Sequence, residues 1–297
     1  MVLSELLGLG TAFCIAFSGM IATGVSRSFG AVAFTRLRMI ILFVIMIAIA
    51  AFFGLWNKID INKISILIVS GVIGIVMGDT ALYAAYSRLG PRRTSLMFSL
   101  SAPFSVFMGI IFLNDEISKF DLLGLGLILI GIVIAVAFRD GNNLKSGWEE
   151  VRGKLIIGVG FGILAALGQA AGTIISKPVM EAGVHPVTAT ALRVGCAAVL
   201  LILMGWLPVQ DFKAKRRISK KIFLLTTVST CVGMGLGMTL QMTALIEGRA
   251  GVVATFSAMT PIAVLPMLWI ITKKLPSLLC WAGAIFACAG ILILFNF

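Results

Sequence analysis

The fold is decided by residues 82–103, LYAAYSRLGPRRTSLMFSLSAP, because a similar stretch, LQMTALIEGRAGVVATFSAMTP, returns at residues 240–261. The Gly-rich apolar run 122–137 likewise has a counterpart in residues 278–294. Duplicated sets of membrane helices are typical of secondary transporters, so we interpret the two stretches as an internal repeat. The matching residues are Leu82, Gly90, Phe98, Ser99 and Pro103 in the first stretch and Leu240, Gly248, Phe256, Ser257 and Pro261 in the second.

Composition places the chain in a membrane. Of its 297 residues, 60% are hydrophobic and only 12% are charged, whereas soluble domains carry about 25% charged residues. The apolar residues form segments of about 20, the length that a helix needs to cross a bilayer. The sequence therefore predicts an all-α membrane protein. Ten transmembrane helices are expected, at residues 3–24, 31–55, 64–87, 94–114, 118–138, 154–175, 187–207, 222–245, 251–271 and 277–296.

The ten segments divide into two groups of five. Residues 1–138 form the first repeat, residues 139–153 a polar connecting loop, and residues 154–297 the second repeat. Because each repeat has an odd number of spans, the second enters the membrane from the opposite side, which predicts two inverted repeats around a central cavity. We expect a multi-pass protein of the inner or plasma membrane, either a monomer or a homodimer.

The basic residues lie mainly in loops on one side of the predicted bundle. The net charge of +12 is therefore interpreted as a determinant of topology and of contacts with lipid headgroups, and we expect no nucleic-acid partner. The positive-inside rule places this basic side in the cytoplasm and both termini outside.

The first half is similar to a family pattern. The matching residues are Gly78, Asp79, Leu82, Tyr83, Arg88, Gly90, Pro91, Arg93, Pro103, Gly109, Phe112, Leu113 and Glu116. In these residues the chain resembles EamA-type members of the drug/metabolite transporter superfamily, which implies a ten-helix fold, transport of small molecules, and a cavity lined by the first, third and fourth spans of each half. Many such relatives keep both termini in the cytoplasm, opposite to the charge distribution. In the second half Lys273 and Lys274 replace the expected acidic pair.

Asp79 is the clearest candidate for chemistry, because an ionisable residue within a span is costly and usually functional. Asp79 and Arg38 are each predicted to lie roughly 10–12 Å below the same face, so they can interact. Two interpretations stay open. Asp79 either forms a structural ion pair with Arg38 or Arg36, or caps a helix break; alternatively its carboxylate binds a cation or couples transport to protons, with Arg38 as its partner.

Arg193 is the second charged candidate. It occupies in the second half the place of Arg36, while Gly237 stands where Asp79 would be. Arg193 either extends towards headgroups or offers its charge to an anionic group of a substrate. Pro103 and Pro261 are predicted to kink their helices beside the cavity.

Uncharged polar residues of the predicted cavity spans complete the candidate substrate site. Gln169 and Gln241 are the strongest of them, because a large amide within a span needs several partners. The full set of uncharged candidates is Ser18, Thr23, Tyr83, Tyr86, Ser99, Gln169, Thr173, Gln241 and Ser257.

Other chemistries lack their sequence signals. The five cysteines lie in apolar segments and His185 is the only histidine, so we expect no metal, cofactor or disulfide. The leading interpretation is a secondary transporter of a small polar metabolite, such as an amino acid, by alternating access, with export as the expected direction. The alternative is a membrane-embedded enzyme or flippase for a lipid-linked substrate; an enzyme would need convergent acids or histidines.

Overall fold

The computed structural model describes residues 2–56, 59–113, 118–137, 151–208, 213–247, 259–273 and 275–296, and these residues form helices and no strand. The predicted all-α class is confirmed. Seven helical runs are long and apolar enough to span a membrane, and three shorter apolar helices accompany them. The count of ten spans stays a prediction, and residues 251–258 of the expected span 251–271 lie outside the described residues.

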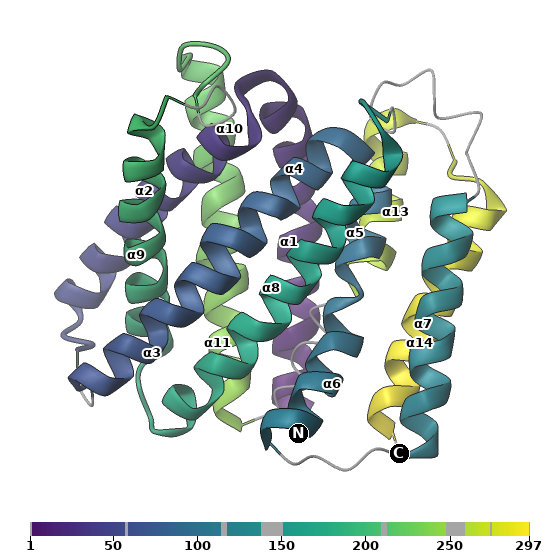
Figure 1. Ribbon diagram of the computed structural model, residues 1–297, viewed down its shortest axis with the longest axis horizontal. Helices are drawn as coiled ribbons and strands as arrows, with labels where there is room; N and C mark the ends of the chain where they lie inside the picture. The colour runs from purple at the N-terminus through teal and green to yellow at the C-terminus, as the bar shows by residue number, and fades with distance from the viewer. Residues whose placement is uncertain are drawn as a thin grey trace.

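The first half consists of five helical runs, two of which change their geometry along their length (Figure 1). The third run begins at Asp60, whose side chain accepts a hydrogen bond from the backbone N–H of Lys63. The fourth begins after Gly90, which has a φ of 83°, with Pro91 in the first turn, a position that suits proline. The elements are α1 Val2–Phe29, α2 Ala31–Phe52, α3 Ile61–Gly71, η1 Val72–Asp79, α4 Thr80–Leu89, α5 Pro91–Phe98, α6 Ser101–Leu113 and α7 Lys119–Ala137.

The second half follows the same order. Its described elements are α8 Leu155–Glu181, α9 Pro186–Trp206, α10 Lys220–Thr230, η4 Cys231–Leu236, α11 Gly237–Glu247, α13 Thr260–Thr272 and α14 Leu278–Asn296. Both η segments are π-helical and occupy corresponding places in the third run of each half. Such segments are rare and often mark functional sites.

The two halves interlock instead of packing side by side. Helix α1 packs on α10, η4 and α11, and α8 packs on α3, η1 and α4, so each half is completed by the other. Helices α7 and α14 pair closely at glycines: a Cβ at Gly131 would lie 2.5 Å from the Gly283 carbonyl oxygen, and one at Gly290 would lie 2.8 Å from the Ile128 nitrogen. Small residues permit such close helix contacts in membranes.

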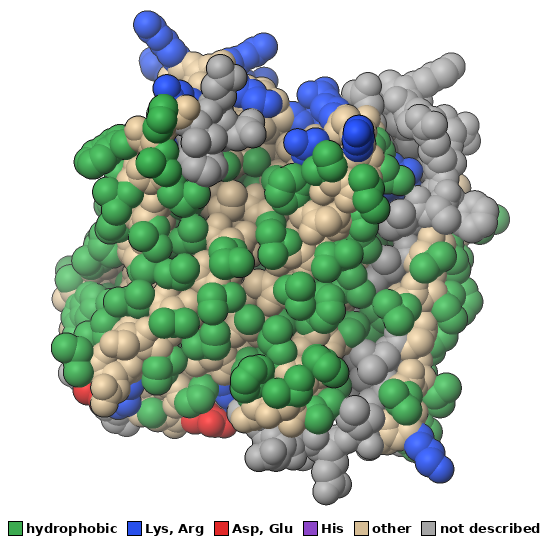
Figure 2. Space-filling model, viewed as in Figure 1, with side chains coloured by type: hydrophobic (Ala, Val, Ile, Leu, Met, Phe, Trp, Pro, Cys, Tyr) green, Lys and Arg blue, Asp and Glu red, His purple; other side chains and the backbone are tan. Residues whose placement is uncertain are grey.

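Charge separates the two ends of the bundle. Both chain termini lie at one end in Figure 1, and Figure 2 shows Lys and Arg side chains gathered at the other end. At the end with the termini, two described lysines are paired with acids: Lys63 with Asp60 at 3.5 Å and Lys177 with Glu181 at 2.9 Å. The large exposed side chains between the two ends are mainly aliphatic and aromatic, as a bilayer requires.

Candidate substrate site in the central cavity

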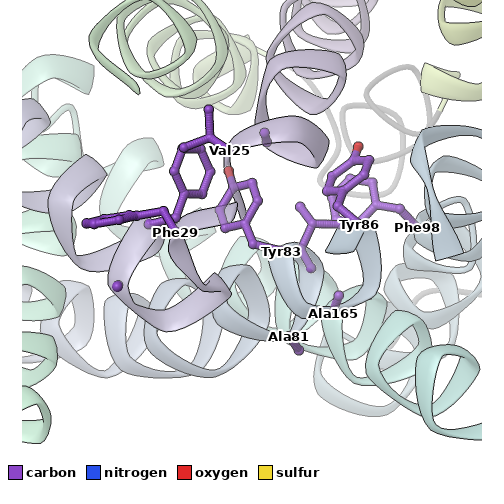
Figure 3. Packing of buried hydrophobic residues seen from close by; sticks show 11 residues of the cluster. Val25, Phe29, Ala81, Tyr83, Tyr86, Phe98 and Ala165 are labelled. Carbon is purple, nitrogen blue, oxygen red and sulfur yellow. The ribbon is translucent and has the colours of Figure 1, made fainter. Parts of the chain in front are cut away.

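A small cavity lies where the two halves meet. It measures about 40 Å³ and is lined by residues of α1, α2, η1, α4, α5, α8, η4 and α11. That space holds only a few water molecules, so it is too small for a metabolite in this conformation. Figure 3 shows Tyr86 of α4 next to Phe98 of α5, with Tyr83 on the side of Phe29 of α1; all four belong to one buried cluster beside the cavity.

Arg38 is fully buried on the cavity wall. Its Nη1 donates a hydrogen bond to the Tyr83 hydroxyl, and its Nη2 donates to the backbone oxygen of Ser229 at 3.2 Å. The guanidinium also lies 4.7 Å from the centroid of the Tyr83 ring and 5.3 Å from that of Phe34, which adds cation–π attraction. Only its Nε has no partner. These contacts fix the guanidinium in place while leaving one donor free.

A serine bridge supports this arrangement. The hydroxyl groups of Ser18 on α1 and Ser229 on α10 lie 2.9 Å apart, and the Ser229 hydroxyl donates to the Ser18 backbone oxygen at 3.2 Å. The carbonyl that accepts from Arg38 therefore belongs to a residue anchored to α1. The first and second halves thus share the support of one arginine.

Asp79 ends η1 and is only 8% exposed. Its carboxylate lines the cavity, and Oδ2 has no hydrogen-bond partner in the described chain. The charges of Arg38 and Arg193 both act on it, but neither forms a direct ion pair with it. Arg36 lies elsewhere, beside Gly205 of α9 and near Lys215 at the basic end. Of the two arginines considered as partners, only Arg38 shares the cavity with Asp79.

Arg193 is 3% exposed and lies inside the bundle, so the expectation that it extends to headgroups is wrong. Its Nη1 donates to the Met242 sulfur at 3.5 Å. A Cβ at Gly74 would lie 3.0 Å from its Nη2, and one at Gly172 would lie 3.1 Å away. Arg193 is next to the cavity wall without lining it.

The contacts also correct the sequence alignment of the halves. Arg193 meets Met242 of α11 as Arg38 meets Tyr83 of α4. The counterpart of Arg193 is therefore Arg38 and not Arg36.

Two amides from the second half face the cavity together. The Gln169 Nε2 donates to the Gln241 Oε1 at 3.2 Å, which links α8 to α11. The Gln241 Nε2 is buried without a partner in the described residues. Tyr86 also lacks a partner for its hydroxyl, which lies against Gly19 of α1. Unpaired donors and acceptors thus face one cavity from both halves.

Three further candidates, Thr23, Ser99 and Thr173, are not among the residues that line the cavity. The hydroxyl groups of Thr23, Thr173 and Ser99 donate to backbone oxygens one helical turn earlier, at 2.8, 2.9 and 3.2 Å. Ser257 lies outside the described residues.

The prolines are near helix starts. Pro103 is in the first turn of α6, after a turn at Ser99 and Leu100, and Pro261 is the second residue of α13. The break in the fourth run thus precedes Pro103, because proline fits the first helical turn.

Comparison with known proteins identifies the family. The model of the EamA-like transporter family matches residues 2–137 and again residues 156–296. The chain belongs to the EamA-like transporter family. It is a multi-pass membrane transporter of the drug/metabolite type, and members of this family are generally not enzymes. A search of curated protein sequences found no match.

A solved structure described only as "Crystal structure of protein" has a similar fold to this EamA-like chain. The TM-score is 0.69, the sequence identity is 15%, and the match covers 98% of this chain and 95% of the other. At this identity the likeness shows the fold alone.

Sequence reasoning missed several contributors to the cavity of this EamA-like transporter. Thr11 lines it and donates to the Gly237 backbone oxygen at 3.2 Å, and Ser229 supports Arg38. A signal for Ser229 existed in the repeat. Ser70, its counterpart in the first half, donates to the Gly172 backbone oxygen at 2.7 Å, just as Ser229 donates to that of Ser18. Serines repeated in both halves would have identified this helix contact.

Proposed function

We propose that this chain is a secondary transporter that moves a small polar metabolite with an anionic group, such as an amino acid or related compound, by alternating access. The observation that carries the proposal is the set of unpaired buried polar atoms on one cavity: Arg38 Nε, Asp79 Oδ2, Tyr86 Oη and Gln241 Nε2. Buried polar groups are normally hydrogen-bonded, and a buried group without a hydrogen bond costs free energy of folding. Their convergence supports a site for a polar ligand.

The charges around the cavity favour an anionic group on that ligand. Arg38 and Arg193 together outnumber Asp79, the only acid among the described residues that line the cavity. A substrate carboxylate would accept hydrogen bonds from Arg38, since a charge-assisted bond is stronger than a neutral one. Gln169 and Gln241 would bind the remaining polar groups. The expected direction, export, depends on the orientation of the chain and on the gradients.

Asp79 is proposed to couple transport to protons. Helix α2, which carries Arg38, begins at the basic end, and α9, which carries Arg193, begins at the end with the termini (Figure 1). One carboxylate is therefore attracted by arginines whose helices enter from opposite faces. Protonation of Asp79 would remove its attraction to both. The same step would leave the positive charge of Arg38 uncompensated, so that it attracts a substrate carboxylate more strongly.

Counterflow in proteoliposomes tests the proposal. Vesicles containing the purified chain are loaded with one amino acid, and entry of the labelled compound is followed. The matched control is the amine that lacks only the carboxyl group. We expect exchange of at least one carboxylate-bearing compound and no exchange of its amine. Equal exchange of both compounds would contradict the role of Arg38. No exchange across a broad panel of amino acids and related compounds would contradict the proposed substrate class.

A labelled phospholipid in the same vesicles tests the flippase alternative. We expect the wild-type chain to leave the distribution of the lipid between leaflets unchanged. Lipid movement without metabolite exchange would favour the alternative. An enzyme acting on a lipid-linked substrate is less well supported, because Asp79 is the only acid, and no histidine is present, among the described residues that line the cavity.

A further inference from the structure

A larger hollow lies on the other side of α1 from the central cavity. It is a groove of about 790 Å³ between α1, α10 and α13, within the range of known ligand sites. Ile15 and Ser18 of α1 face the central cavity, whereas Phe17 and Ile21 face the groove. The two spaces are therefore separated by α1 itself.

The walls of the groove are apolar along most of its length. Phe17 and Ile21 of α1, Ile222 and Leu225 of α10, and Ile270 of α13 line it. Phe17 is 39% exposed and Ile270 is 73% exposed, so the protein leaves these side chains uncovered. The occupant of such walls must itself be apolar along their length.

The mouth of the groove is polar and basic. Arg216 and Lys221 line it at the basic end of the bundle, together with Ser28 in the last turn of α1 and Ser219 at the start of α10. The lining contains no acidic residue among those described. An occupant therefore meets two positive charges and two hydroxyl groups at one end.

The depth of the groove matches one leaflet. From Phe17 to Ser28 the groove follows α1 for about 16 Å at 1.5 Å per residue. This is about half of the ~30 Å hydrocarbon core of a bilayer. A molecule that fills the groove is thus apolar over the length of one leaflet and anionic at its surface end.

We propose that the groove binds one anionic phospholipid from the leaflet at the basic end, with an acyl chain between α1, α10 and α13 and its phosphate at Arg216 and Lys221. Basic pockets between membrane helices bind acidic headgroups in this way. A phosphatidylcholine fits less well, because its own cation faces the two basic side chains. The lipid also stabilises the contact between α1 and α10, the two helices that carry the Ser18–Ser229 bridge.

Native mass spectrometry of the purified full-length chain tests this site with two lipids of equal chain length, phosphatidylglycerol and phosphatidylcholine. We expect the wild type to retain phosphatidylglycerol at least several-fold better. The double variant Arg216→Ala/Lys221→Ala should lose this preference. The control Lys213→Ala/Lys220→Ala removes the same charge nearby, at residues that do not line the groove, and should keep it.

A third variant tests the apolar part of the site. Gly24 lines the groove between Ile21 and Ser28, so Gly24→Leu should fill it and lower retention of both lipids. The charge-preserving variant Arg216→Lys/Lys221→Arg should bind as the wild type does, which separates loss of charge from misfolding.

Three results would overturn the proposal. An equal loss of the preference for phosphatidylglycerol in the groove variant and in the control variant would show that surface charge alone attracts the lipid. Equal retention of the two lipids by the wild type would remove the role of the basic mouth. Displacement of phosphatidylglycerol by millimolar inorganic phosphate would show an ion site without the acyl chain. None of these readouts depends on transport.

Discussion

The two halves place corresponding residues around the cavity but supply different chemistry. In the first half Arg38 meets a tyrosine hydroxyl, that of Tyr83; in the second half Arg193 meets a thioether, that of Met242. The acid Asp79 has no acidic counterpart among the described residues of the cavity lining. The first half therefore contributes the charged and aromatic part of the site.

The second half contributes amides where the first half is apolar. The contacts of the third helical run of each half show the correspondence: Gly78 of η1 lies against Gly168 of α8, as Gly237 of α11 lies against Cys14 of α1. Gln169 follows Gly168 along α8, and Ile15 follows Cys14 along α1.

The same correspondence extends to the facing helices. Gln241 occupies the place of Leu82, and all four side chains, Ile15, Leu82, Gln169 and Gln241, line the cavity. Duplication has kept the backbone frame while the cavity side chains have diverged, which suits a substrate that has different groups at its two ends.

Exchanging each arginine for glutamine should give the largest difference between the halves. Arg38→Gln removes two hydrogen bonds from a charged donor, each contributing about 1.5–3 kcal/mol, so we expect a loss of stability of roughly 3 kcal/mol or more and a low yield of folded protein. Arg193→Gln loses one weak contact to sulfur and should fold better. Thermal unfolding in detergent measures both. A larger loss of thermal stability in Arg193→Gln than in Arg38→Gln would contradict this difference between the halves.

Replacing glycines at which two helices approach closely by alanine should have an intermediate effect on stability. In Gly168→Ala the new Cβ would lie 2.7 Å from the Gly78 Cα, a backbone atom that cannot easily move, so we expect destabilisation of about 1–3 kcal/mol. In Gly237→Ala the nearest atom is the Cys14 side chain at 3.2 Å, and the cost should be smaller. Gly160→Ala, with no atom within 4 Å, is the control. The melting temperature should be lowest for Gly168→Ala, higher for Gly237→Ala and highest for Gly160→Ala.

Replacing the amides by their first-half counterparts should change recognition more than stability. The double variant Gln169→Ile/Gln241→Leu removes both partners of one hydrogen bond, which costs little when the shape is kept. Loss of one or two bonds to substrate should weaken its apparent affinity by about 3- to 10-fold. Thr173→Val, which removes a hydroxyl that bonds within its own helix, should transport normally. Unchanged affinity in the double variant would exclude the amides from the site.

The sequence predicted much of this frame because long apolar segments and a repeat are strong signals. The helical class follows from hydropathy. The similar predicted depth of Arg38 and Asp79 in the membrane identified two residues that share the cavity. The π-helical geometry of η1 and η4 was not predictable, because one residue of extra helical register leaves no mark in an apolar run.

The sequence alignment of the third runs was one residue out. It paired Asp79 with Gly237, but the contacts pair Gly78 with Gly237, just as they pair Ser70 with Ser229 before either π-helical segment begins. The burial of Arg193 also escaped prediction, because its space is created by Gly74 and Gly172 on two other helices. Single hydroxyls such as those of Thr11 and Ser229 are common in apolar spans, and only tertiary contacts distinguish them.

Asp79→Asn tests most directly whether the Asp79 carboxylate in the cavity couples transport to protons. This change keeps the shape of the side chain and removes its charge. In proteoliposomes with an imposed pH gradient, the account predicts that the variant loses gradient-driven accumulation of a substrate that the wild type accumulates, while counterflow of the same substrate without a gradient stays measurable. Full gradient-driven accumulation by Asp79→Asn would contradict the account and leave Asp79 a structural role beside Arg38 and Arg193.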